Sequence, residues 1–165
     1  MPRPVRVPLV RATAFGLLAM LAATPCAALF LGTCSVAATA VGFGTYDPLA
    51  ATALSSTGTV TVTCSGTALL TVPVTVSLNA GMWGTFAARS AASGASRLGY
   101  NLYRDPAETQ IWGDGSSGTS TVALSVFILV IGTGSSSATV YGLVPNGQDV
   151  APGTYTDTIT ATVSY

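Results

Sequence analysis

Three carboxylates share one turn-rich stretch, and they are the first residues whose spacing suggests chemistry. Asp105, Glu108 and Asp114 lie within ten residues, beside Asp-Pro and Asp-Gly turn signals. Carboxylates bind calcium, but this spacing matches no known calcium loop, which favours solvated turn acids. Asp105 and Glu108 could in principle act together on a glycosidic bond, yet nothing in the sequence sets the distance between their carboxyl groups.

Other catalytic groups are missing from the chain. It has no histidine and no lysine, so it lacks the usual residues for acid–base catalysis and for a phosphate-binding loop. The glycine-rich stretch 113–118 has no basic residue, and no Gly-x-Ser-x-Gly elbow occurs. The sequence therefore predicts a protein that is not an enzyme and that uses no cofactor, metal or small-molecule substrate.

The N-terminal region has the pattern of an export signal. An apolar run, 12–23, follows Arg3, Arg6 and Arg11, and small residues then precede a predicted cleavage after Ala28. This divides the chain into a signal peptide, 1–28, and one domain, 29–165. Two alternatives stay open. An uncleaved anchor would need about 20 apolar residues, and a lipoprotein signal would need a small residue before its cysteine.

Export changes the charge and the number of cysteines. Three arginines then face six acids, for a net charge of −3, and no basic patch remains for nucleic acid. Cys26 leaves with the signal, and Cys34 and Cys64 remain as a pair in an oxidising compartment. Their disulfide would stabilise the domain by about 3 to 4 kcal/mol. A metal site would need more ligands than two thiols.

The elements that position these residues are predicted to be β-strands. Only 7% of residues are charged, and strand and turn formers dominate, which favours an all-β sandwich. The longest alternation runs from Gly153 to Tyr165. Threonine or serine occupies the even positions, and the odd positions hold Tyr155, Asp157, Ile159, Ala161, Val163 and Tyr165. Nothing follows this strand to cover its edge, so it lies inside a sheet or its open side takes another chain.

Shorter strands are predicted at 34–43, 59–64, 71–78, 97–104 and 138–144. Loops are predicted at 79–96 and 105–120. Pro73 lies on the outward phase of its strand, which indicates an edge position or a bulge.

The segment Val122–Ile131 is different, because its apolar run is nearly continuous. It is too short to cross a membrane. One interpretation is a strand covered on both faces. The other is an exposed apolar finger or contact surface.

Five ordered motifs, together with the two cysteines, make the chain from Cys34 to Tyr165 resemble the spore coat protein U domain family. They are Phe43–Pro48, Gly99–Tyr103, Ile111–Gly115, Thr139–Gly142 and Ala151–Thr158. Members of this family are mostly subunits of archaic (Csu-type) chaperone-usher pili in Gram-negative bacteria. The resemblance implies an incomplete immunoglobulin-like sandwich of the pilin type, with an open groove beside its C-terminal strand.

In such pilins an inserted strand from a partner fills the groove. The resemblance implies a periplasmic chaperone, an outer-membrane usher and a neighbouring pilin subunit as partners, and a route through the periplasm to the cell surface. Tyr165 would be the anchoring point for the chaperone. The groove residues would be Val36, Val41, Ile159, Ala161 and Val163.

A fibre subunit also donates a strand from the segment before its first cysteine. Only Leu29–Thr33 would remain after the predicted cleavage, which is about 17 Å of chain for a groove of about 40 Å. We therefore expect a subunit that accepts a strand without donating one, at a fibre tip with a role in attachment and biofilm formation. An exported protein that starts near Ala12 would contradict this.

The expected contact surface of such a tip consists of Met82, Trp83, Phe86, Phe127 and Ile128. The alternative function is a secreted spore-coat or matrix protein that acts without pilus assembly.

Overall fold

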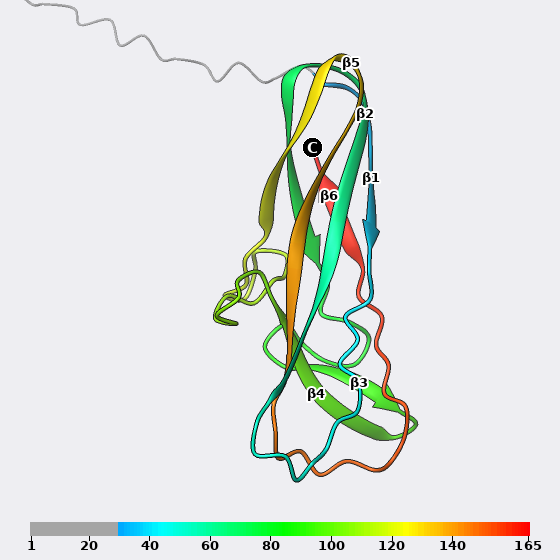
Figure 1. The fold of residues 1–165 in the computed structure, drawn as a ribbon, viewed down its shortest axis with the longest axis vertical. Coiled ribbons are helices and arrows are strands. Elements are labelled where there is room, and N and C mark those ends of the chain that lie inside the picture. Colours follow the sequence, from blue (N-terminus) through cyan, green and yellow to red (C-terminus); the bar gives the residue numbers. More distant parts are fainter. Residues whose placement is uncertain (1–29) are drawn as a thin grey trace, which may run out of the picture.

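The computed structural model describes residues 30–165, and this part of the chain is an all-β sandwich with no helix (Figure 1). It therefore contains no helix that could span a membrane. The predicted signal peptide lies outside the described residues. The strands are β1 (Leu31–Ala38), β2 (Leu54–Leu78), β3 (Arg89–Ser93), β4 (Ser96–Tyr103), β5 (Val122–Val144) and β6 (Ala161–Ser164).

The sandwich is built on one long antiparallel ribbon. β2 and β5 pair without interruption from Leu54 opposite Val144 to Val76 opposite Val122. The ribbon folds over at one end of the molecule (Figure 1). Gly134 lies so close to Phe127 that a Cβ placed on it would overlap the Phe127 carbonyl oxygen. Seven residues of straight strand would separate the two by about 23 Å, so β5 bends between them. The two halves of β5 therefore form opposite layers of the sandwich.

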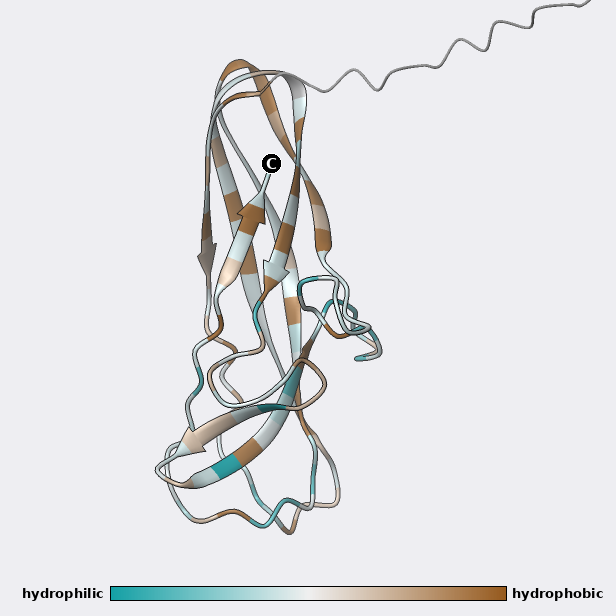
Figure 2. Ribbon diagram, turned by 180° about the vertical axis from the view of Figure 1, so that it is seen from behind, coloured by the Kyte–Doolittle hydropathy of each residue, from teal (hydrophilic) through white to brown (hydrophobic). Residues whose placement is uncertain are grey.

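The remaining strands extend these two layers. β1 pairs with the first half of β2, and β6 pairs with its last four residues. β4 pairs with the end of β5, and β3 continues from β4, which gives the order β1-β2-β5-β4-β3. Figure 2 shows hydrophobic and polar residues alternating along the long strands.

The predicted inward residues of β2 form the core between the layers. They are Val60, Val62, Cys64, Val72, Val74, Val76 and Leu78, and each is at most 3% exposed. Pro73 is exposed on the same strand, at a position just past the last β6 pair, Thr75 with Ser164. This is a local edge, where a missing N–H group costs no ladder hydrogen bond.

Four predictions of elements need correction. The strand predicted at 34–43 is β1, which ends at Ala38, and residues 39–43 are not part of a strand. Residues 79–96 are not all loop, because β3 occupies Arg89–Ser93. The predicted last strand, 153–165, is paired as a strand only in β6, although its odd residues from Tyr155 to Val163 are half-buried and its even residues exposed. Val122–Ile131 is not covered on both faces, because Val126 and Ile128 are buried whereas Phe127 and Leu129 are exposed.

Candidate strand-docking groove

An open groove of about 1080 Å³ separates two extended segments, 38–46 and 150–161. The first segment continues β1 and the second leads into β6. The groove floor is apolar and comes from β2, β3, β4 and β5, through Val60, Leu78, Ala91, Leu98, Tyr100, Leu102, Val140 and Val144. Its shape and lining suit an extended apolar segment more than a compact ligand.

The segment that leads into β6 presents one unpaired edge. Thr156 exchanges backbone hydrogen bonds of 2.9 and 3.1 Å with Ala92, and the Thr160 carbonyl oxygen accepts one of 3.0 Å from the Asn79 N–H group. Neighbouring residues of an extended chain point to opposite edges. The backbone groups of Asp157, Ile159 and Ala161 therefore point to the other edge, where no strand of the described chain pairs.

Two tyrosines hold the groove walls in place. The Tyr100 hydroxyl donates a hydrogen bond of 2.7 Å to the Asp157 carboxylate, which also accepts one from the Met82 N–H group. Burial, together with this hydrogen bond, raises the pKa of the Tyr100 phenol above its ordinary value. At the other wall the Tyr46 hydroxyl donates to the Pro145 carbonyl oxygen and accepts from the Gln148 N–H group.

A buried arginine, Arg89, joins three segments that adjoin the groove. Arg89 is 0% exposed and donates hydrogen bonds to Asn101 Oδ1 at 2.7 Å and to the carbonyl oxygens of Asn79 and Trp112 at 2.7 and 2.8 Å. Burial lowers the pKa of Arg89. Sequence reasoning missed this residue, since an arginine in a predicted loop gives no signal of burial.

The predicted groove residues fall into two sets. Val41, Ile159 and Ala161 line the groove. Val36 and Val163 pack against the core instead, half-buried and away from the groove lining. Tyr165 is exposed at the chain end, with its ring 5.5 Å from that of Phe30.

The predicted contact surface is split between two segments. Met82 and Trp83 are 66% and 43% exposed in the loop between β2 and β3, where the Arg97 guanidinium lies 4.3 Å from the Trp83 ring centroid. Phe127, in β5, is 57% exposed, but its neighbour Ile128 is 2% exposed and belongs to the core. Phe86, half-buried, lies 5.5 Å from the Arg89 guanidinium.

The two cysteines form the predicted disulfide. Cys34 of β1 and Cys64 of β2 are directly opposite each other in the ladder, and their sulfur atoms are 2.00 Å apart. The bond fixes the strand beside the groove to the central strand. This pairing is confirmed.

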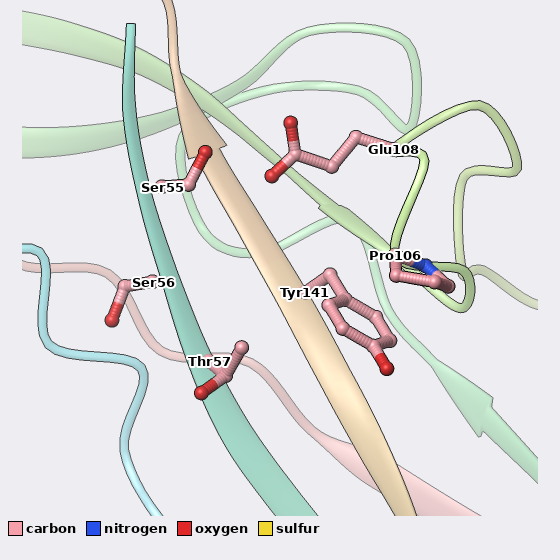
Figure 3. A pocket seen from close by; sticks show the side chains of 6 residues that line it. All are labelled: Ser55, Ser56, Thr57, Pro106, Glu108 and Tyr141. Carbon is pink, nitrogen blue, oxygen red and sulfur yellow. The ribbon is translucent and has the colours of Figure 1, made fainter.

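The predicted acids lie elsewhere, around a shallow polar hollow of about 580 Å³ (Figure 3). Glu108 and Pro106 face Ser55 and Tyr141 across it. Asp105 does not join Glu108, because its carboxylate accepts hydrogen bonds from the Thr109 hydroxyl and from two backbone N–H groups. The Thr109 hydroxyl is the main reason why the pKa of Asp105 is lowered.

Asp114 is likewise engaged within its own turn. Its carboxylate accepts hydrogen bonds from the Ser116 hydroxyl and N–H group, and these lower the pKa of Asp114. Within residues 30–165, no three metal-ligating side chains gather at one point. Asp105 and Asp114 therefore stabilise their own turns.

Known proteins resemble this chain in sequence and in fold. Protein U of Myxococcus xanthus is 35% identical over 147 residues, which cover 81% of this chain and 78% of that protein. In a crystal structure of the CsuC–CsuE chaperone–tip adhesion subunit pre-assembly complex, from archaic chaperone-usher Csu pili of Acinetobacter baumannii, one chain matches with a TM-score of 0.55 and 21% identity. The match covers 82% of this chain and 40% of that chain, so this chain spans less than half of its structural neighbour.

The neighbour's pilus-subunit fold agrees with the predicted incomplete immunoglobulin-like sandwich, and this fold class is confirmed. The profile of the Spore Coat Protein U domain matches residues 18–162. The chain therefore belongs to the Spore Coat Protein U domain family.

Proposed function

We propose that this protein is a structural subunit of a chaperone-usher surface pilus, assembled by insertion of a partner's strand into the groove. The observation that carries the proposal is the apolar groove beside an unpaired strand edge. An inserted strand would hydrogen-bond to the free backbone groups of Asp157, Ile159 and Ala161 and place alternate apolar side chains on the floor.

Three partners are part of the proposal, and they rest on membership of the family. A periplasmic chaperone would fill the groove first. At an outer-membrane usher, a strand of a neighbouring pilin would then replace the chaperone and remain in the groove in the fibre. In the CsuC–CsuE pre-assembly complex a chaperone is bound to a tip adhesion subunit, which supports the chaperone step of this proposal. Export would use residues 1–28 as a cleaved signal peptide and deliver domain 29–165 to the cell surface.

A position at the fibre tip, with an adhesive role, is the finer part of the proposal. The structural neighbour comes from a complex that contains a tip adhesion subunit. Here, exposed apolar side chains gather at the ribbon bend, with Leu129, Val130 and Ile131 each more than half exposed, and Figure 2 shows this end as hydrophobic. Met82 and Trp83 add a second apolar patch. Such patches suit contact with an apolar surface during attachment and biofilm formation.

The groove is tested by an immunoblot of the sheared surface fraction from the native host, with samples loaded unheated and boiled. Inserted strands are part of the core, so their complexes survive detergent until heated. We expect a high-mass band that collapses to monomer on boiling. Ile159→Lys places a charge in the groove, and we expect it to reduce this band at least about tenfold, equivalent to about 1.4 kcal/mol.

Thr160→Lys is the matched control, because Thr160 is exposed on the opposite phase of the same segment. It should leave the high-mass band unchanged. Monomer in both lanes for the unmodified protein, with abundant protein in the medium, would reject pilus assembly and favour the secreted coat or matrix function.

A further inference from the structure

The polar hollow around Glu108 is separate from the groove. Its strand residues Thr57 and Tyr141 are directly opposite each other on β2 and β5. Val140, next to Tyr141, is buried and lines the groove. Because neighbouring residues of a strand point to opposite faces, the hollow and the groove lie on opposite faces of the same strands. A ligand in the hollow leaves the groove free, so the site does not depend on pilus assembly.

The loop after β4 presents Glu108 to the hollow. This loop is held by the Asp105 carboxylate, which accepts hydrogen bonds from the N–H groups of Thr109 and Gln110. Glu108 has a φ of 55°, a left-handed conformation that strains any residue other than glycine. Its side chain points toward Ser55 (Figure 3). A glycine would form this turn with less strain, so the turn itself does not account for a glutamate here.

The hollow carries a negative charge that no cation neutralises. Glu108 is half-buried, and in the described part of the chain no donor reaches its carboxylate, since those of its own loop bond to Asp105. None of the lining residues is basic, and Arg104 is directed to a backbone carbonyl group elsewhere. Burial raises the pKa of Tyr103, opposite Tyr141 on the same face, and the charge of Glu108 adds to this shift. A positively charged ligand complements such a site.

The rest of the lining suits a sugar ring. The Tyr141 side chain lies beside Pro106 and offers apolar surface (Figure 3). Ser55 and Thr57 add two exposed hydroxyl groups from β2, whereas Ser56, between them, donates its hydrogen bond to a backbone carbonyl group. An aromatic ring packs against the C–H face of a sugar, and hydroxyl and carboxylate groups bind its polar edge.

We propose that the hollow binds a cationic amino sugar of a polysaccharide, with the ammonium group on Glu108 and the sugar ring on Tyr141. The charge decides between sugars, because a neutral sugar would leave the carboxylate without a cation. Asp105, which a hydrolytic carboxylate pair would need, is engaged in its own turn, so the site binds without cleaving.

The hollow, of about 580 Å³, is in the size range of ligand sites. It is shallow, so one exposed ion pair gives only weak affinity. Where many copies of the protein meet one polysaccharide, their contacts act together and the association strengthens.

The test is surface plasmon resonance on the whole exported protein, with a glucosamine tetramer as the probe. Two other probes separate the parts of the ligand. The N-acetylglucosamine tetramer has the same rings without the positive charges, and spermine has four amines without the rings. We expect a Kd of about 1 mM for the glucosamine tetramer, and binding at least about tenfold weaker for each of the other probes.

Three variants test the part played by Glu108. Glu108→Gln keeps the shape of the side chain and removes its charge, and should weaken binding of the glucosamine tetramer at least about tenfold. Asp149→Asn is the matched control, because it removes an exposed carboxylate outside the hollow, and should leave binding unchanged. Glu108→Gly should also abolish binding, yet unfold at no lower urea concentration than the unmodified protein, because glycine relieves the strained backbone.

Four results would overturn the proposal. They are no binding of the glucosamine tetramer, equal affinity for the neutral tetramer or for spermine, equal losses from Glu108→Gln and Asp149→Asn, and a clear loss of stability in Glu108→Gly. The last would show that the glutamate supports the fold. None of these results bears on the groove or on pilus assembly.

Discussion

At the scale of single residues, Arg89 joins three segments that adjoin the groove. Its guanidinium joins the loop after β2 to β4 and to the segment at Trp112, through Asn79, Asn101 and Trp112. A fully buried cation is costly unless its donors are all used. Here two nitrogen atoms of the guanidinium fork reach three acceptors, whereas a lysine would have to meet all three from one nitrogen atom.

Replacement of this residue gives the prediction at this scale. Arg89→Met should lower the free energy of unfolding by at least about 2 kcal/mol, because the buried oxygen atoms of Asn101 and Trp112 each lose a charged donor. Arg97→Met is the control, since Arg97 is exposed, and should cost less than about 1 kcal/mol. Urea unfolding measures both. Equal losses from the two variants would contradict the role given to Arg89.

At the scale of elements, the bend of the β2–β5 ribbon decides how the layers meet. Gly134 lies directly against the Phe127 carbonyl group and the Val126 side chain. Only a residue without a side chain allows the layers to approach so closely.

Gly134→Val should therefore destabilise the fold by about 2 to 4 kcal/mol, because the overlap is with backbone that cannot move aside. Gly42→Val is the matched control, because a Cβ there has nothing within 4 Å and no unusual backbone angle is required. Thermal unfolding of the two variants makes the comparison. If Gly134→Val were as stable as the control, the layers could not be as close as described.

Local patterns in the sequence predicted the strands well and their arrangement poorly. Alternation in Thr59–Cys64 and Thr71–Leu78 gave the buried face of β2 correctly, because period two depends only on neighbouring residues. That both segments belong to one bent strand depends on pairing with β5, far along the chain. β3 was missed because Arg-Ser-Ala-Ala-Ser has the composition of a loop, and its pairing with β4 overrides that weak local preference.

The sequence also predicted only part of the candidate groove. The residues Val41, Ile159 and Ala161 were identified through family resemblance and alternation. Ile128 was wrongly expected at the surface, since a continuous apolar run does not reveal which phase faces the core. The Tyr100–Asp157 hydrogen bond joins two distant segments, and no local pattern predicts it.

At the scale of the whole molecule, the proposed tip position has its own test. Immunogold labelling of the native host with an antibody to this protein should place about one label at the free end of each fibre. An antibody against the main fibre subunit provides the control and should label the whole length. Labelling along the length by both antibodies would contradict a tip position, while leaving incorporation through the groove intact.

The continuous pairing of β2 with β5 also governs how the chain folds. β3, β4 and their loops lie between the two strands, so every contact in the central ladder spans a long stretch of sequence. Such a high contact order makes folding slow. β2 would leave the export channel well before its partner β5, with its apolar face and the edge that pairs with β5 unsatisfied. A protein built this way needs protection from aggregation during the interval between export and ribbon closure.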